Sequence, residues 1–234
     1  MPVASAQVAA PVPAAPSEFT DALSGDDMGR LIGLTDGMFG FAITLLVTTL
    51  VVPKECLGLA VQEPCLAGDL WTEGYLVLAY LFSFAVLGIW WIRHHMLFRY
   101  IGRYDAALLW GNLVFLITIG ITPFILGVFA NYTGVEVAVV LFALVQAAAG
   151  GMLLVLLEIA VRADLLKPGV PPPFLARFRR RLYITPLIFL ISAGVALISV
   201  YAAHIIWAGI FIEIIWTQLS ATRLRSSPSK PQAQ

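Results

Sequence analysis

Two threonines in the first apolar stretch of the chain, Thr44 and Thr48, carry hydroxyl groups of a kind that can contact a passing cation. At helical spacing they share one stripe with residues three or four positions away. The stripe comprises Gly37, Phe41, Thr44, Thr48 and Val52, with Leu45 beside it. Hydroxyls on one stripe can line a narrow path for an ion. A second interpretation stays open, in which both hydroxyls bond back to the carbonyls of Gly40 and Thr44 and the stripe only packs.

Asp36 lies about two turns after the expected start of the same helix. A carboxylate at that depth needs a partner, because an unpaired charge facing lipid is costly. Arg30 lies too far round and along the helix for a direct same-face pair. Three basic side chains end the second apolar stretch at the expected depth: Arg93, His94 and His95. The residues therefore predict either a packed polar cluster between helices or a proton relay or ligand site.

Other ionisable side chains lie within apolar stretches or at their ends. Glu158 and Glu213 can carry protons or bind ions, although membrane carboxylates near helix ends also pair with arginine or reach the interface. His94 and His95 are adjacent and point to different sides of a helix, and no Cys, Asp or Glu set with ligand spacing accompanies them, so no metal site is predicted. We interpret His204 as an interfacial residue.

These residues require a membrane protein to position them. Of the 234 residues 60% are hydrophobic and only 12% are charged, and the mean hydropathy is +0.90. A soluble domain of this size cannot hide so much apolar surface, and nothing favours binding to nucleic acid. Six apolar stretches are long enough to span a bilayer, so we predict an all-α protein with six transmembrane helices. They cover residues 31–52, 71–92, 106–129, 135–161, 182–201 and 204–219.

The basic residues give this arrangement an orientation. All of them except Lys54 fall on one side of the six predicted helices. Because Lys and Arg in short loops stay cytoplasmic, both termini are predicted to be cytoplasmic. Residues 1–28 and 222–234 are rich in Ala, Pro, Ser and Gln, which predicts disordered cytoplasmic tails around a transmembrane domain at 29–221.

The loop between the first two predicted helices contains Cys56 and Cys65 on the non-cytoplasmic side. A disulfide is chemically permitted there, and two unpaired thiols are the alternative. Glu55, Glu63 and Asp69 lie in the same segment, where their negative charge can gather cations.

Three segments together resemble the potassium channels related to the lysosomal transmembrane protein 175. Their signature, R-x-x-x-F-S-D-G followed by an apolar helix with I-T-L-L, is matched here by RLIGLTDG from Arg30 and by ITLL from Ile43. The segments WWIRHHMLFRYIGRYD and LLWGNLVFLITIGITPF resemble the end of the second helix and the third helix of prokaryotic members. One copy of the signature matches the single-repeat prokaryotic form. Leu34-Thr35 replaces Phe-Ser, and Phe41 stands where Ile or Leu is usual.

The resemblance implies a homotetrameric potassium channel in the cell membrane, a multi-pass protein that is not an enzyme and needs no cofactor besides the permeant potassium ion. The first helix of each subunit is expected to line the pore. Carried over by position, the constriction falls at Phe41, Leu45 and Thr48, and the hydroxyl ring that favours potassium falls at Thr44. A polar network is expected to hold the first helix to the second and third, formed by Arg30, Thr35, Asp36, His94 and Asp105.

No carbonyl filter of the T-V-G-Y-G type occurs, so selection must come from the helix itself, through apolar rings that dewet and hydroxyls that replace water. A secondary transporter or a proton-coupled permease that uses intramembrane carboxylates is the alternative function. Such transporters usually contain interrupted helices and internal repeats. We expect Pro123 to break the third helix, but the chain shows only one copy of the signature.

Overall fold

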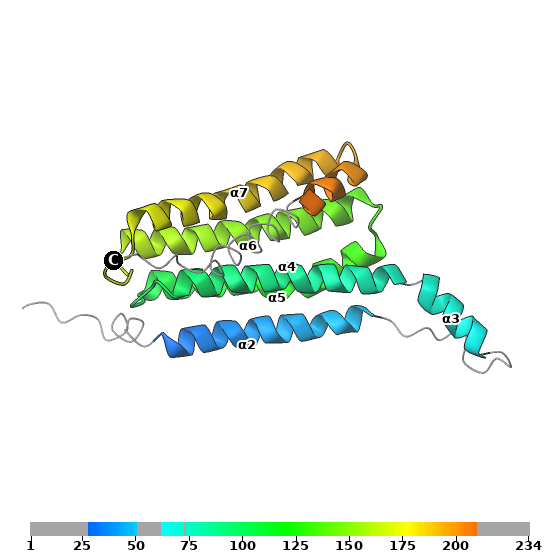
Figure 1. Ribbon diagram of the computed structural model, residues 1–234, viewed down its shortest axis with the longest axis horizontal. Coiled ribbons are helices and arrows are strands. Elements are labelled where there is room, and N and C mark those ends of the chain that lie inside the picture. The colour runs from blue at the N-terminus through cyan, green and yellow to red at the C-terminus, as the bar shows by residue number, and fades with distance from the viewer. Residues whose placement is uncertain (1–27, 51–61, 73, 210–234) are drawn as a thin grey trace, which may run out of the picture.

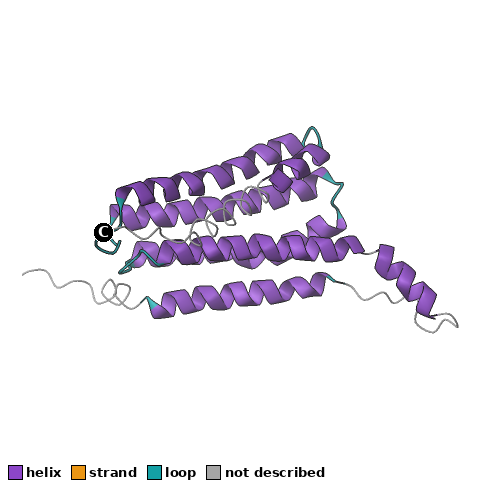
Figure 2. Cartoon of the chain, in the orientation of Figure 1, coloured by secondary structure: helices purple, strands orange, loops and turns teal. Residues whose placement is uncertain are grey.

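The computed structural model describes residues 28–50, 62–72 and 74–209, and every regular element within them is helical (Figure 2). The long helices are α2 (Gly29–Leu45), α4 (Gly74–Phe98), α5 (Ala106–Asn131), α6 (Glu136–Arg162) and α7 (Pro172–Ala196). A short 3₁₀ segment, η1 (Leu46–Thr49), continues α2, and α3 (Gln62–Thr72) precedes α4. A further short helix, Val200–Gly209, follows α7.

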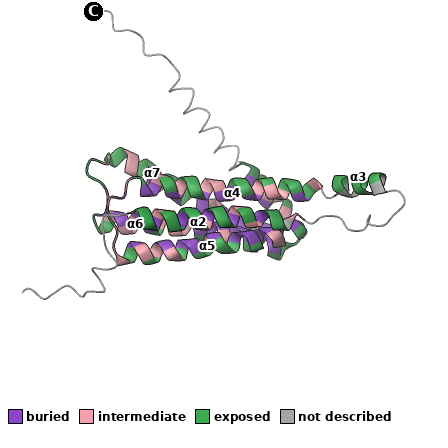
Figure 3. Cartoon of the chain, turned by 90° about the horizontal axis from the view of Figure 1, so that it is seen from below, coloured by how far each residue is buried: buried purple, intermediate pink, exposed green. Residues whose placement is uncertain are grey.

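Consecutive long helices are antiparallel to one another and form three layers (Figure 1). In that view α6 and α7 form one layer, α4 and α5 the next, and α2 lies against the far side. The view turned by 90° places α2 between α4 and α5, both of which it contacts (Figure 3). We call the end where α2, α5 and α7 begin the basic end, because its loops contain Arg99, Arg103 and Lys167. The other end is the opposite end, and α3 projects beyond the bundle there (Figure 1).

Four helices in the described part of the chain are long and apolar enough to cross a membrane. They are Gly29–Thr48, Gly74–Phe98, Ala106–Asn131 and Glu136–Arg162, so the first four predicted spans are confirmed as apolar helices within a few residues. The helix is the form that such sequences must take in lipid, because it satisfies its backbone hydrogen bonds internally.

The fifth and sixth predicted spans have different bounds. The prediction took residues 182–201 as one span, but α7 begins at Pro172, so the run of arginines that precedes Leu182 belongs to its first turns. The helix ends at Ala196, and a turn separates it from the next helix, where Ser199 Oγ accepts a hydrogen bond from the Ala202 amide at 3.3 Å. Serine is favoured at such N-cap positions. We missed this signal in the sequence because Ser199 lies within an apolar run. Residues 210–219, with Glu213, lie outside the described residues.

We expected Pro123 to break the third spanning helix, but it does not. It lies inside α5, which continues as one helix from Ala106 to Asn131. Thr122 lies beside the proline and donates its hydroxyl to the Thr118 carbonyl at 2.7 Å. Spanning helices tolerate proline where neighbouring side chains and small adjustments satisfy the backbone, so the proline is no evidence for an interrupted transporter helix.

At the basic end, backbone hydrogen bonds join the loop after α4 to the loop after α6. Gly102 donates to Leu165 at 2.9 Å, and Lys167 donates to Tyr100 at 2.8 Å. Asp164 adopts a left-handed φ of 52°, and the Leu165 amide reaches back to the Ala160 carbonyl at 2.9 Å, as in a Schellman cap. This paired segment ties the α6–α7 layer to the α4–α5 layer.

Cys65 lies in α3 and is disulfide-bonded. Cys56, the other cysteine of the chain, lies outside the described residues.

Candidate functional site

The helix α2 has one face against the rest of the chain and one face turned away from it. Its buried face is formed by Leu31, Thr35, Phe39, Ala42 and Leu46. On the other side Phe41 is 61% exposed, and Gly37, Thr44 and Thr48 are exposed as well. The described residues of the stripe identified from helical spacing therefore point away from the rest of the chain, with Leu45 partly covered at their edge, and Val52 lies outside the described residues.

Both threonine hydroxyls on this face bond back to their own helix. Thr44 Oγ1 donates to the Phe41 carbonyl at 2.8 Å, and Thr48 Oγ1 donates to the Leu45 carbonyl at 2.7 Å. The acceptors expected from the sequence, Gly40 and Thr44, are thus wrong by one residue, in keeping with the tightening of the helix into η1. A hydroxyl has one hydrogen and two lone pairs. Back-bonding uses the hydrogen and leaves the oxygen able to face a cation, so the two interpretations of these threonines are compatible.

Glycines on the same side of α2 leave its backbone open. A Cβ placed at Gly33, Gly37 or Gly40 would meet nothing within 4 Å. Small residues allow the backbone of a neighbouring helix to approach closely in a membrane. This face is therefore physically able to contact another helix or an aqueous path.

A buried chain of hydrogen bonds holds the other face of α2 to its neighbours. Asn112 Nδ2 donates to Thr35 Oγ1 at 2.9 Å, and Thr35 Oγ1 donates to the Leu31 carbonyl at 3.0 Å. His94 Nε2 and Asn112 Oδ1 lie 2.9 Å apart. All three side chains are almost fully buried. The chain joins α2, α4 and α5, and Asn112, which bridges the other two, was missed in the sequence although an amide in an apolar helix is a signal of such a role.

Two aromatic rings fix the imidazole of His94. It stacks on Phe98 with ring centroids 4.0 Å apart and on Phe115 with centroids 5.3 Å apart. A ring held between two others keeps Nε2 aimed at Asn112, so packing and hydrogen bonding determine the same orientation.

Asp36 bonds to a different residue of α4 from those expected. Trp91 Nε1 donates to Asp36 Oδ1 at 2.9 Å, and the ring of His95 stacks on Trp91 with centroids 5.6 Å apart. The partner is an indole and not one of the basic side chains Arg93, His94 or His95. Trp91 points toward α2, whereas Arg93 bonds to α7 and His94 to α5. His95 follows Trp91 by four residues on the same face and stacks on its ring.

The two remaining members of the expected network lie apart from it. Arg30 is exposed in the first turn of α2. Asp105 Oδ1 accepts from the Leu108 amide at 2.8 Å and so forms the N-cap of α5. The structure thus brings Thr35 and His94 together through Asn112, places Asp36 on Trp91, and gives Asp105 a capping contact.

Residues 90–94 of α4 make side-chain hydrogen bonds to four neighbouring helices. Trp91 bonds to α2 and His94 to α5, as described above. Trp90 Nε1 donates to Gln146 Oε1 of α6 at 2.7 Å. Arg93 Nη1 donates to Thr185 Oγ1 of α7 at 2.7 Å. The segment WWIRH, which we call the α4 junction, therefore orients α2 relative to the whole bundle.

Known proteins match this chain over the same elements. The family model described as endosomal/lysosomal potassium channel TMEM175 matches residues 30–123, from the start of α2 into α5. A protein of Streptomyces collinus named as a potassium channel is 30% identical over 195 residues, which cover 76% of this chain and 88% of that relative. The chain belongs to the TMEM175 family of potassium channels.

Two further matches come from Chamaesiphon minutus. A potassium channel of that organism is 33% identical over 106 residues, which cover 45% of this chain and 51% of the relative. The crystal structure of a lysosomal potassium-selective channel TMEM175 homolog superimposes with a TM-score of 0.68, at 24% identity, and covers 84% of this chain and 98% of that one. This likeness shows a shared fold, and the resemblance inferred from the motifs is confirmed.

In this TMEM175-family protein the carboxylate of Glu158 is paired. Arg179 of α7 approaches both of its oxygens, with Nε–Oε1 at 2.7 Å and Nη2–Oε2 at 3.0 Å. The pair crosses from α6 to α7 and so links these two helices through their side chains. Within the described ranges no three His, Cys, Asp or Glu side chains lie close enough together to hold a metal ion.

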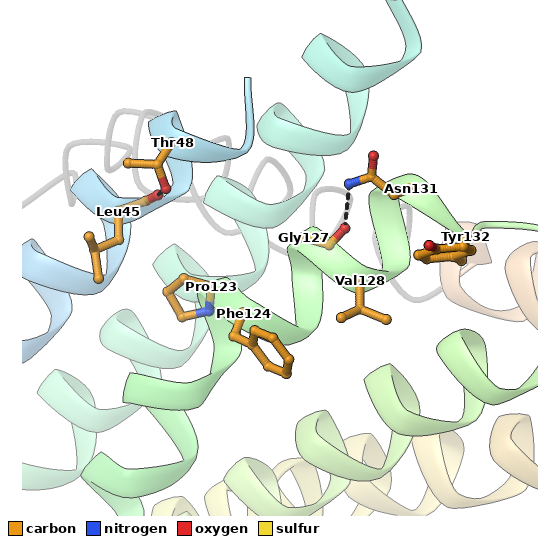
Figure 4. Close-up of a pocket in the computed structure, with 8 residues that line it drawn as sticks. All are labelled: Leu45, Thr48, Pro123, Phe124, Gly127, Val128, Asn131 and Tyr132. Carbon is orange, nitrogen blue, oxygen red and sulfur yellow. Dashed lines mark hydrogen bonds between the residues drawn. The ribbon is translucent and has the colours of Figure 1, made fainter. Parts of the chain in front are cut away.

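Two cavities lined by described residues lie beside α2. One of about 460 Å³ at the basic end is lined by residues that include Asp36, His95 and Lys167. The other, of about 590 Å³, lies toward the opposite end, where Leu45 and Thr48 face Pro123 and Phe124 of α5 across a groove (Figure 4). Leu45 and Thr48 border this groove, so in a single subunit they line an open space beside α2.

Proposed function

We propose that this TMEM175-family protein is a passive potassium channel, a homotetramer whose central pore is lined by α2 of each subunit. The observation that carries the proposal is the two-sided character of α2. Its stripe with Phe41, Thr44 and Thr48 is exposed, while its other face is buried and hydrogen-bonded to α5 through Thr35. Beside these faces the exposed Asp36 accepts a hydrogen bond from Trp91 of α4. A helix held in this way presents the same stripe to a symmetry axis in every subunit.

Each residue of the stripe has a role in this proposal. Phe41, Leu45 and Thr48 form the constriction, where apolar rings close the path by dewetting. Four Thr44 oxygens replace part of the water around potassium, and back-bonding to Phe41 orients them. Selectivity over sodium is modest, because hydroxyls hold an ion less rigidly than stacked carbonyls.

The polar contacts of α2 position the pore wall. Thr35 and His94 act with Asn112, Asp36 acts through Trp91, and Asp105 supports the start of α5. Arg30 lies at the entrance of the pore. The protein crosses the cell membrane six times with both termini in the cytoplasm, it needs no cofactor, and potassium is the permeant ion.

Potassium flux into liposomes tests the proposal. The purified full-length chain should give electrogenic potassium flux, and Thr44→Ala, which removes the hydroxyl from all four subunits, should lower the preference for potassium over sodium by about fivefold, the equivalent of about 1 kcal/mol for the whole ring. Thr118→Ala is the matched control, because its hydroxyl also bonds back to its own helix but lies on α5. Absence of flux, or unchanged selectivity in a conducting Thr44→Ala protein, would overturn the proposal.

The constriction and the subunit number need separate measurements. Phe41→Ala and Leu45→Ala should each raise the single-channel conductance, and the larger increase identifies the tighter ring. Native mass spectrometry should give the mass of four chains. A stable dimer as the largest species would contradict the central four-fold pore.

A further inference from the structure

A cavity of about 700 Å³ lies at the opposite end of the bundle, away from α2. It is bordered by the start of α4, the end of α5 and the short helix Val200–Gly209. Its volume falls in the range of small-molecule sites in proteins, and such sites are mostly apolar with a few polar groups. The cavity belongs to none of the contacts that hold or form the proposed pore.

The floor of this cavity is a rigid aromatic surface. Trp207 is buried, with 2% of its surface exposed, and its Nε1 donates to Ser192 Oγ at 2.7 Å, which satisfies its polar edge. Phe129 lies edge-on to Trp207 with ring centroids 5.6 Å apart. Because these rings are already packed, a ligand does not need to order them, and this lowers the cost of binding.

One polar atom in the cavity wall lacks a partner. His204 lines the cavity, and its Nε2 is buried and has no hydrogen-bond partner among the described residues. The ring is held against Trp207 in a T-shaped contact with centroids 5.3 Å apart. A buried nitrogen without a partner costs free energy, so a hydroxyl that bonds to it once the imidazole turns toward the cavity gains affinity. A hydroxyl suits either tautomer of the imidazole, because it both donates and accepts.

The remaining lining residues indicate an uncharged ligand. No Asp, Glu, Lys or Arg belongs to the described residues that line the cavity. Tyr75 and Tyr201 stand at its rim with 50% and 81% of their surfaces exposed, as tyrosines do where a bilayer meets water. A ligand can therefore enter from the bilayer past these tyrosines and place its apolar body over the rings.

We propose that this cavity binds an uncharged amphiphile from the bilayer that has a single hydroxyl group, with the hydroxyl on His204 Nε2 and the apolar body over Phe129 and Trp207. The proposal is independent of ion conduction. The alternative occupant, a lipid acyl chain, would fill the same apolar space without using the histidine.

Binding of tritiated 4-hexylphenol to the full-length protein in phosphatidylcholine nanodiscs tests this proposal, with empty nanodiscs to subtract partition into lipid. We expect saturable binding, and a loss of about five- to tenfold in affinity in His204→Phe, which keeps the ring but removes the nitrogen. Ala79→Leu, which narrows the cavity, should abolish saturable binding. Tyr183→Phe, which removes an exposed hydroxyl on α7 outside the cavity, should bind like the wild type.

A second probe separates the hydroxyl from the apolar body. 1-Hexyl-4-methylbenzene replaces the hydroxyl with a methyl group, and its affinity should be the same for wild type and His204→Phe. Both variants are compared by gel filtration and circular dichroism to establish that they fold. Absence of saturable binding overturns the proposal. Binding that Ala79→Leu abolishes but His204→Phe leaves unchanged also overturns it, and would indicate an acyl-chain site.

Discussion

In the proposed channel the hydroxyl of Thr44 serves both structure and transport. Its hydrogen goes to the Phe41 carbonyl, and its oxygen keeps lone pairs on the exposed side of α2. Thr35 has the same chemistry but lies on the buried side, where its oxygen accepts from Asn112. The face of the helix on which a threonine lies therefore decides whether its oxygen is buried against protein or exposed, as the proposed ion contact requires.

At Thr35 the hydroxyl should contribute measurably to stability. Thr35→Val keeps the shape but leaves the Asn112 amide without its acceptor, so we expect a loss of about 1–3 kcal/mol in the free energy of unfolding. Thermal unfolding in detergent measures the change. Thr118→Val, which removes only a bond to the Phe115 carbonyl of its own helix, should cost less than about 1 kcal/mol. Equal losses in the two variants would contradict a structural role of the buried chain.

Among the described helices, α4 makes the side-chain hydrogen bonds that position the other long helices. The α4 junction bonds to α2, α5, α6 and α7 within five consecutive residues of the sequence WWIRH. In lipid there is no hydrophobic driving force between helices, so close packing and polar contacts of this kind determine their association. Arg93 also lies over the Trp90 ring at 5.2 Å, which links two of these contacts.

The closest packing in this region is at Gly150 of α6. A Cβ there would lie 2.9 Å from Cη2 of Trp90 and 3.1 Å from Cδ of Pro186. Gly150→Ala should therefore lower the free energy of unfolding by about 1–3 kcal/mol through overpacking. Gly151→Ala is the control, since nothing lies within 4 Å of its added Cβ. Thermal unfolding of both proteins should separate them, and a Gly150→Ala protein as stable as Gly151→Ala would show that the helices can move apart without cost.

The ion pair between α6 and α7 gives a prediction about coupling. Removal of one partner in Glu158→Gln or Arg179→Gln leaves a half-buried charge unpaired, and we expect each to cost about 1–2 kcal/mol. The double variant should be more stable than the sum of these losses implies. The exposed pair of Arg103 and Asp164, 3.7 Å apart, is the reference and should show no measurable coupling. Additive losses at Glu158 and Arg179 would mean that the pair contributes nothing.

At the scale of the whole molecule, charge and hydropathy define a bundle with one basic end. The proposed orientation puts that end in the cytoplasm, because translocation of clustered Lys and Arg is disfavoured. The α2 stripe then runs from the cytoplasmic side outward, and the hydrogen-bonded side of the helix faces its own subunit.

Labelling from one side of the membrane tests this orientation. A membrane-impermeant maleimide should react with Ser227→Cys only from the cytoplasmic side and with Asn131→Cys only from the outside. The measurement uses oriented vesicles under non-reducing conditions, in which Cys65 remains disulfide-bonded. Reaction of both cysteines from the same side would refute the proposed topology of six spans with a cytoplasmic C-terminus.

The sequence by itself determined the class of protein, the first four spanning helices and the face of α2 that carries Phe41, Thr44 and Thr48. These features are local, since hydropathy and the helical period depend only on residues close together in the chain. Helix ends also depend on local signals, such as the N-cap at Ser199, but this cap was missed because it lies within an apolar run. The continuity of α5 through Pro123 depends instead on the neighbours of the proline.

Only the tertiary structure decided which polar groups meet. Asn112 bridges Thr35 and His94, Trp91 takes the place expected for a basic partner of Asp36, and Glu158 finds Arg179. A side chain's partner depends on the rotation and depth of two helices that are far apart in sequence, and no pattern within one helix specifies these. The exposed stripe was therefore readable from α2 alone, whereas the contacts that hold it in place became visible only once the bundle was assembled.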